Sequence, residues 1–343
     1  MVKIERILCP IDLLTESDEA LRYAIALARA YDAKLLLLYC TQIKSEKAQI
    51  ENRHLSVDIA VSFEQALIRH LGLAQLCDLN WEALAIENVR DVCEAITHQA
   101  KVHCADLIVM RSRRRPHAAV LLGSTAEKVS RTGPCPVLVT HPNEVEWVSY
   151  STGEVDLRRV LVAHDFSSDS ELALKYGCSL AQEYQAELHV LHVLDSTQHL
   201  KTALPWSSSI NDNDHIFAAS KLQRAVPKEA SLWCKVVTSV RCGKPYDEVL
   251  AYAKEQKMDL ICLGARGSGW SLGKLFGSNV DRVLRQPPCP VLVARPNRQP
   301  DWLKPYRVLE SDVGGGYDNV TTGSESKYGD ARPNSFQNRT ESA

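Results

Sequence analysis

A segment in the second half of the chain has the residue types that bind phosphate. Gly264 and Gly267 follow an apolar run, and Gly277 and Ser278 begin a segment with helical periodicity. We expect Gly264 and Gly267 to have positive φ, so that the backbone turns sharply and approaches a ligand closely. Free amide groups and the dipole at a helix start form an anion site. The segment predicts a phosphate site that includes the Ser278 hydroxyl, with Asn279 as its neighbour.

The segment matches neither of two common glycine-rich phosphate motifs. A P-loop needs a glycine, four residues and then Gly-Lys-Ser/Thr, but Ser268 stands at its first position and Leu275 follows Lys274. The dinucleotide motif Gly-x-Gly-x-x-Gly fails because Leu272 stands where the last glycine belongs. The phosphate site must therefore be of another kind.

Two further candidates follow strands of the same half. Asp165 comes just after the apolar run 160–163, and Val193 lies near the end of the apolar run 188–194. In an open parallel sheet, ligands bind beyond the carboxyl ends of the strands, where the strand order reverses. We therefore expect Asp165 and Val193 to lie near the glycine segment.

The elements that must position these residues occur twice. Arg6–Asp12 matches Arg159–Asp165 at an offset of 153 residues, and Cys135–Val139 matches Cys289–Val293 at an offset of 154. One residue of net insertion over this span indicates a duplication. In the second repeat we predict strands over 160–163, 188–194, 232–240, 260–263 and 291–294, and helices over 168–184, 214–225, 245–256 and 278–285.

This alternation of strands and helices predicts an α/β fold of two tandem, doubly wound domains. The strands are nearly continuous apolar runs, which is typical of a parallel sheet covered on both faces. Ser168 or Asp169 is the expected cap of the first helix in the second repeat. We place the first domain at 1–142, a linker at 143–156, the second domain at 157–296 and a disordered tail at 297–343, which is polar.

The composition excludes several classes of protein. The formal net charge of −2 gives no field that would attract nucleic acid or an anionic membrane. No apolar stretch is long enough to cross a membrane, and charges interrupt any signal-peptide core at the N-terminus. Several of the eleven cysteines, such as Cys9, Cys262 and Cys289, lie in apolar runs, which is typical of reduced thiols. We expect a cytoplasmic protein.

The spacing of the glycines carries a resemblance to a known family. Two residues separate Gly264 from Gly267, nine separate Gly267 from Gly277, and Ser278 follows. This G-x2-G-x9-G-S pattern resembles the ATP-binding signature of the universal stress proteins, and the resemblance covers about residues 3–141 and 157–296. It implies five-stranded parallel sheets in the order 3-2-1-4-5, the adenine nucleotide alpha hydrolase-like fold. It also implies that the glycines and Ser278 hold the phosphates of ATP, with Mg²⁺ accompanying the nucleotide.

The same resemblance implies which residues contact the adenine end of the nucleotide. The aspartate after the first strand contacts the adenine end in the family, which implies that role for Asp165, with Val193 as a weaker candidate beside it. The alternative is structural. The glycines would then allow helices to pack on the sheet, and Asp165 would cap the next helix.

The first repeat departs from the pattern. Arg111 and Arg114 replace the first two glycines, while Asp12, Gly123 and Ser124 remain. A bulky side chain would crowd the phosphate path, so we expect a lost or altered site. A guanidinium could instead grip a phosphate directly, or the basic cluster could be a solvated loop.

The resulting hypothesis is a stress-response protein that binds an adenine nucleotide through its second repeat and acts as a sensor or regulator. Alternatives are an adaptor that works through an unknown protein partner without nucleotide, and a slow ATPase. The sequence offers no paired acid and base and no activated nucleophile. His189 and His192 lie three apart on a predicted strand, so they face opposite sides and cannot easily share a metal.

The last expectation concerns assembly. Single-domain proteins of the family commonly pair through their fifth strands, which match 136–140 and 290–294 here. These strands are short and apolar, and two joined copies offer each other a partner at high effective concentration. We therefore predict an intramolecular pseudo-dimer with a local twofold axis, to which a homodimer of whole chains could be added.

Overall fold

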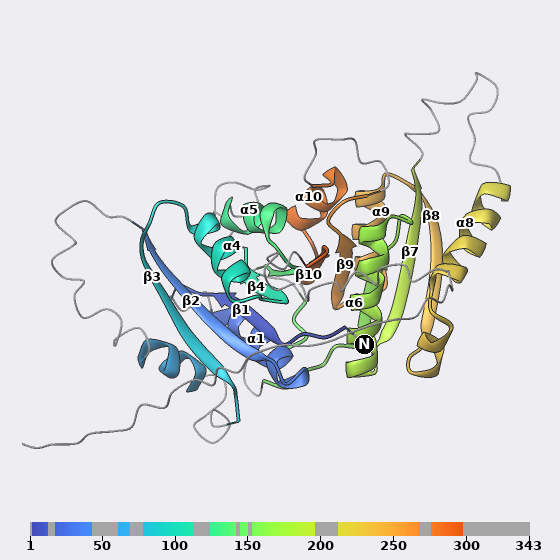
Figure 1. Ribbon diagram of the computed structural model, residues 1–343. Coiled ribbons are helices and arrows are strands. Elements are labelled where there is room, and N and C mark those ends of the chain that lie inside the picture. The colour runs from blue at the N-terminus through green and yellow to red at the C-terminus, as the bar shows by residue number, and fades with distance from the viewer. Residues whose placement is uncertain are drawn as a thin grey trace, which may run out of the picture. The chain divides into compact units, whose positions relative to one another are not determined.

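Figure 1 shows the computed structural model of the chain, which describes residues 2–12, 18–42, 61–68, 78–112, 124–141, 145–149, 153–195, 212–267 and 276–297. The expected tail beyond Asn297 lies outside these residues, as do Arg114 and Gly123 of the first candidate site. Within the described part, strands and helices alternate along both repeats, as the sequence predicts.

The first repeat forms a parallel five-stranded sheet in the order β3-β2-β1-β4-β5. A short helix over 61–68 precedes β3 in the chain. The other elements are β1 (Arg6–Pro10), α1 (Asp18–Ala30), β2 (Lys34–Gln42), β3 (Trp81–Val89), α4 (Val92–Val102), β4 (Leu107–Arg111), α5 (Ser124–Thr132) and β5 (Val137–Thr140).

The second repeat has the same parallel order, β8-β7-β6-β9-β10. The predicted bounds of α6, α10 and β10 are confirmed to the residue. Its elements are β6 (Arg159–Ala163), α6 (Ser168–Tyr184), β7 (Glu187–Asp195), α8 (Asp212–Ala225), η4 (Lys228–Leu232), β8 (Val236–Gly243), α9 (Pro245–Glu255), β9 (Leu260–Gly264), α10 (Ser278–Arg285) and β10 (Val291–Ala294).

Two local predictions in the second repeat are wrong. The third strand does not span 232–240 but begins at Val236, because the 3-10 helix η4 precedes it and leaves Leu232 exposed. The cap of α6 is neither Ser168 nor Asp169. Instead, the hydroxyl of Ser167 accepts a hydrogen bond from the backbone amide of Ser170, so Ser167 is the cap and the helix begins at the next residue.

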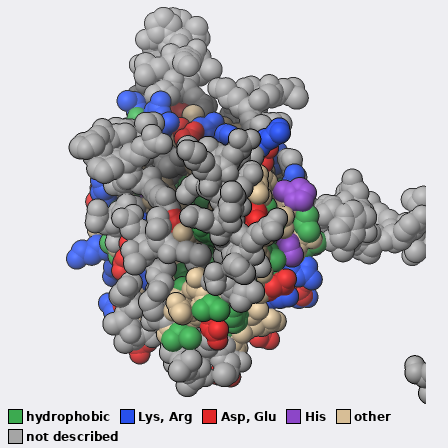
Figure 2. All heavy atoms as spheres, turned by 90° about the vertical axis from the view of Figure 1, so that its left-hand side faces the viewer, with side chains coloured by type: hydrophobic (Ala, Val, Ile, Leu, Met, Phe, Trp, Pro, Cys, Tyr) green, Lys and Arg blue, Asp and Glu red, His purple; other side chains and the backbone are tan. Residues whose placement is uncertain are grey.

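Helices cover both faces of the sheet and bury its apolar strands (Figure 1). One core contains side chains of α1, α6 and α8, and the other contains side chains of α4, α5, α9 and α10. Cys9, Cys262 and Cys289 are fully buried in these cores, as expected of apolar thiols. Among the described helices, none combines the length and the apolar character needed to cross a membrane. Figure 2 shows basic and acidic side chains interspersed over the described part of one face.

The two repeats join through their fifth strands into one ten-stranded sheet. β5 and β10 pair antiparallel, with Leu138 opposite Leu292, Val137 opposite Val293 and Val139 opposite Val291. Since Leu138 and Leu292 are equivalent residues of the repeats, this register is symmetric about their pair. The predicted pairing of the fifth strands within one chain is confirmed.

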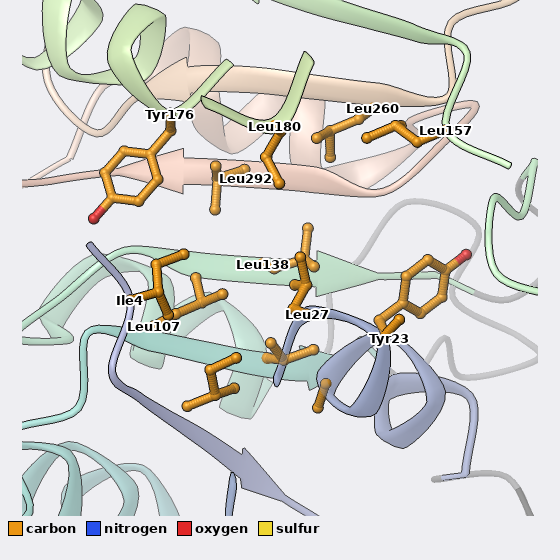
Figure 3. Packing of buried hydrophobic residues seen from close by; sticks show 14 of the residues in the cluster. Ile4, Tyr23, Leu27, Leu107, Leu138, Leu157, Tyr176, Leu180, Leu260 and Leu292 are labelled. Carbon is orange, nitrogen blue, oxygen red and sulfur yellow. The ribbon is translucent and has the colours of Figure 1, made fainter. Parts of the chain in front are cut away.

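An apolar core lies beneath this seam (Figure 3). Leu138 and Leu292 are 2% and 3% exposed, and they belong to a cluster that draws on both repeats. The side chains that meet there are Ile4, Leu27 and Leu107 of the first repeat and Tyr176, Leu180 and Leu260 of the second. The repeats therefore share a hydrophobic core rather than merely touching.

Two side chains at equivalent positions reach across the seam. The Arg295 guanidinium donates to the carbonyl oxygens of Ser130 (2.5 Å) and Gly133 (2.6 Å) at the end of α5. The His141 Nε2 donates to the carbonyl oxygen of Leu284, 2.8 Å away, at the end of α10. The last carbonyl groups of a helix have no partner within it, so each repeat caps a helix of the other.

The segment between the repeats is built into the core. Trp147 is 1% exposed, and its ring meets Tyr23 of α1 edge-on at 4.8 Å and Tyr184 of α6 at 6.0 Å. Next to it, Glu146 forms an ion pair with Arg22, whose side chain is buried. The linker segment therefore places an aromatic side chain between helices of the two repeats.

We predict that Trp147→Ala lowers the free energy of unfolding by about 3–5 kcal/mol, since it removes a large buried side chain that both repeats contact. Trp233→Ala is the matched control. Trp233 is 47% exposed, so its loss should cost about 0.5 kcal/mol or less. Urea denaturation measures both values. Equal losses in the two variants would show that Trp147 does not hold the repeats together.

Candidate functional site

The carboxyl ends of β6, β7 and β9 meet at one edge of the sheet. β6 lies between β7 and β9, and Ala163 pairs with Leu191 on one side and Leu263 on the other. Asp165 and Val193 each lie two residues beyond these pairs, so they stand at the same level. The structure thus places Asp165 against Gly267 in the segment after β9, and Val193 on the neighbouring strand β7.

The predicted positive φ at Gly264 and Gly267 is wrong, since neither glycine has one. Steric contact explains both residues instead. A Cβ at Gly264 would lie 2.6 Å from the backbone of Asp169 and Ser170 in α6. A Cβ at Gly267 would lie 2.6 Å from the Asp165 carboxylate. Gly264 therefore allows α6 to pack on β9, and Gly267 allows the turn to approach Asp165.

Gly277 is different, because the chain itself does not require a glycine there. Its φ of −72° and ψ of 137° suit any residue. A Cβ would meet no atom nearer than 3.5 Å, and the nearest are the carbonyl oxygen of Ala265 and a methyl of Val280. Among the described residues a substituent here is therefore tolerated, and it would project beside the first amide groups of α10.

The start of α10 has the features of an anion site. Gly277 is its N-cap and has no side chain to accept a hydrogen bond from the first turn. The first amide groups of a helix lack intrahelical partners, and the helix dipole adds positive potential there. Ser278 and Asn279 are exposed at this end. Among the described residues, no side chain caps this helix, so its first amides are a candidate anion site.

Asp165 is fixed by the start of α6 without being its cap. Its Oδ1 accepts hydrogen bonds from the backbone amide of Ser167 (3.1 Å) and from the Ser167 hydroxyl (2.5 Å). That hydroxyl also lies 3.2 Å from the carbonyl oxygen of Arg266, in the turn after β9. The alternative in which Asp165 caps α6 therefore does not hold, because Ser167 does so.

An aromatic and cationic cluster beside Asp165 was not evident from the sequence. Phe166 has a φ of 65°, which is unusual for a bulky residue. The Lys221 ammonium lies over its ring, 4.0 Å from the centroid, and the His192 ring packs against it at 4.5 Å. Burial lowers the pKa of His164 and of His192, which favours their neutral forms. Since α8 contributes Lys221, only the fold brings this cluster together.

The histidines of β7 face opposite sides, as their spacing predicts. His189 shares a hydrogen bond with the Tyr252 hydroxyl of α9 at 2.9 Å, whereas His192 Nδ1 donates to the His164 carbonyl oxygen at 2.8 Å. In the part of the chain that the structure describes, no three His, Cys, Asp or Glu side chains converge as metal ligands would.

The corresponding place in the first repeat holds an arginine in place of a glycine. Asp12 follows β1 as Asp165 follows β6. Arg111 stands at the end of β4, where the second repeat has Gly264, and its Nε lies 3.1 Å from a carboxylate oxygen of Glu19. Arg114 and Gly123 lie outside the described residues, and Ser124 is described only as the start of α5. The Arg111 side chain is thus engaged by α1.

The comparisons with known proteins agree with this architecture. The universal stress protein family matches residues 3–141 and 156–295. Universal stress protein MJ0531 of Methanocaldococcus jannaschii is 28% identical over 42% of this chain and 85% of its own. Universal stress protein Slr1230 of Synechocystis is 22% identical over 81% of this chain and 96% of its own.

A solved structure shows the same two-repeat fold. It is the crystal structure of a universal stress protein from Archaeoglobus fulgidus, which is 21% identical. The likeness covers 86% of this chain and 99% of that chain, with a TM-score of 0.58. Since the family match spans both repeats, the chain belongs to the universal stress protein family and carries two of its domains in tandem.

Proposed function

We propose that the second domain binds ATP or a close relative and that the protein acts as a nucleotide-dependent sensor or regulator. The observation that carries this proposal is Gly277. Its backbone accepts any residue and its described surroundings would tolerate a Cβ, yet as the N-cap of α10 it has no side chain to accept from the first amides. A phosphate group held by the first amides of α10 accounts for a glycine that packing does not explain.

The residues around this point suggest how the nucleotide would lie. The triphosphate, with its Mg²⁺, would meet Gly267, Gly277 and the Ser278 hydroxyl. The adenine end would lie toward Asp165 and Val193, on the other side of the turn. Bound nucleotide supplies phosphate oxygens that accept hydrogen bonds, and the chain supplies fixed backbone donors for them.

The alternative function is an adaptor that acts through protein contacts alone. It would need neither a glycine at the N-cap of α10 nor an aspartate between β6 and the turn. Slow ATP hydrolysis would need a group that activates water. Asp165 already accepts two hydrogen bonds from Ser167, which favours a positioning role for it over that of a base.

We predict one ATP site per chain in isothermal titration, with unequal effects of the two equivalent aspartates. Asp165→Asn should weaken ATP binding about tenfold or more, because it removes a charged hydrogen-bond acceptor beside the nucleotide. Asp12→Asn should change the affinity less than about twofold, since Arg111 stands in the first repeat where the second has Gly264. Equal losses would mean that the first domain also binds. No binding to the unmodified protein at millimolar ATP would leave the adaptor.

A further inference from the structure

An ion pair between the buried Asp169 and the partly exposed Arg266 lies next to Gly267 of the proposed phosphate site. Asp169, in the first turn of α6, is 2% exposed, although it is a carboxylate. Its Oδ2 accepts from Arg266 Nε at 2.9 Å, and its Oδ1 accepts from Arg266 Nη2 at 3.0 Å. This two-point contact fixes the plane of the guanidinium as well as its position.

The same pair fixes the backbone of the turn after β9. Asp169 Oδ2 also accepts the Arg266 amide hydrogen at 3.1 Å, and the Ser167 hydroxyl lies 3.2 Å from the Arg266 carbonyl oxygen. On the other side of the turn, the Gly277 amide donates to the Ala265 carbonyl oxygen at 3.0 Å. The peptide groups that lead to Gly267 are therefore tied to α6 and to the start of α10.

Stability alone gives little reason for such a pair. Removing the Asp169 carboxylate from water costs several kcal/mol, and its partner Arg266 is 32% exposed, so that solvent weakens the attraction that offsets this cost. The close packing of α6 on β9 is already made by Gly264. What the pair adds is direction. The amides of Ala265 and Arg266 already donate to Ala294 and Asp169, so the pair, with Ser167, fixes the peptide group between Arg266 and Gly267 and thus the direction of the Gly267 amide. Since its two charges cancel, it does so without adding net charge beside a phosphate.

We propose that Asp169 and Arg266 are positioning residues, which hold the turn at 265–267 in the conformation that receives the phosphate groups of the nucleotide. This inference rests on the proposed function and adds two residues outside the glycine pattern. Ser167 links the pair to Asp165, so one network orients both the phosphate side and the adenine side of the site.

Isothermal titration of the full-length protein with ATP and with AMP tests the proposal. In Asp169→Asn and in Arg266→Gln, ATP affinity should fall about tenfold, while AMP affinity should fall less than about threefold, because AMP has fewer phosphates for the turn to hold. The double variant should be no worse than either single variant, since both act through the same turn. The double variant leaves no unpaired charge, so it can still be measured if either single variant fails to fold.

The control is Glu187→Gln, at the opposite end of β7. It removes ion pairs with Arg159 and Lys235 and should leave both affinities unchanged. If Asp169→Asn or Arg266→Gln folds and keeps the unmodified ratio of ATP to AMP affinity, the pair is only structural and the inference is wrong. If the unmodified protein binds neither nucleotide, the proposed function fails and this inference fails with it.

Discussion

Gly277→Val is expected to abolish ATP binding while the second domain remains folded. Valine adopts the backbone angles of Gly277 without strain, and its Cβ would meet no atom closer than 3.5 Å. Its methyl groups would occupy the space in front of α10, where we place a phosphate. We expect ATP affinity to fall at least about a hundredfold, which corresponds to about 2.7 kcal/mol of binding free energy. Isothermal titration measures the affinity, and urea denaturation measures the stability.

Gly264→Val is the matched variant and should behave in the opposite way. The added Cβ would overlap the backbone of Asp169 and Ser170, which cannot move without shifting α6. We expect a loss of at least about 3 kcal/mol in the free energy of unfolding, and loss of binding as a consequence. If Gly277→Val also unfolds the domain, or if it binds ATP as the unmodified protein does, Gly277 has no role in leaving room for a ligand.

These two variants separate readings that the sequence could not separate. Glycine spacing predicted a turn and a helix start, and both are present after β9. It also suggested positive φ at Gly264 and Gly267, which was wrong. A glycine can reflect backbone conformation or lack of space, and only the surrounding atoms distinguish them. The neighbours of Gly264 come from α6, about 95 residues earlier in the chain.

The elements themselves were largely predictable, because hydrophobic periodicity is local and the repeat supplied a second copy. The bounds of α6 and α10 illustrate this. The prediction failed at 232–235, where apolar residues read as the start of a strand. Leu232 instead ends a 3-10 helix and is exposed, so its apolar character did not reflect burial in the sheet. Alternation of apolar and polar residues cannot distinguish such a segment from the start of an edge strand.

Long-range side-chain contacts could not be predicted. The pair of Asp169 and Arg266 joins residues 97 apart, and Arg295 reaches a carbonyl group 165 residues away. Trp147 looked like part of a polar linker, because Pro142 and Asn143 precede it and Ser149, Ser151 and Gly153 follow. In the fold it lies where two helices from different domains converge. No local pattern indicates such a meeting point.

The contact between the domains yields the prediction with the largest effect on stability. Leu292→Asp should lower the free energy of unfolding by more than about 4 kcal/mol, because it places a carboxylate among apolar side chains and removes the leucine contacts. Urea denaturation measures this loss. Far-UV circular dichroism should show unchanged sheet content, since the substitution leaves the backbone pairing within each domain intact. Hydrogen exchange at β5 and β10 should become faster.

Leu138 provides the control, since it faces Leu292 across the local axis. Two carboxylates in Leu138→Asp/Leu292→Asp repel each other, whereas Leu138→Lys/Leu292→Asp places opposite charges on facing positions. We expect the second double variant to be more stable than the first by about 1 kcal/mol or more, as facing charges in a sheet favour opposite signs. Equal stabilities would mean that the two side chains do not meet in solution. The domains would then be held together by Trp147 and the helix caps. The loss of unfolding free energy in Leu292→Asp would be no larger than that caused by a cavity at an unrelated buried site.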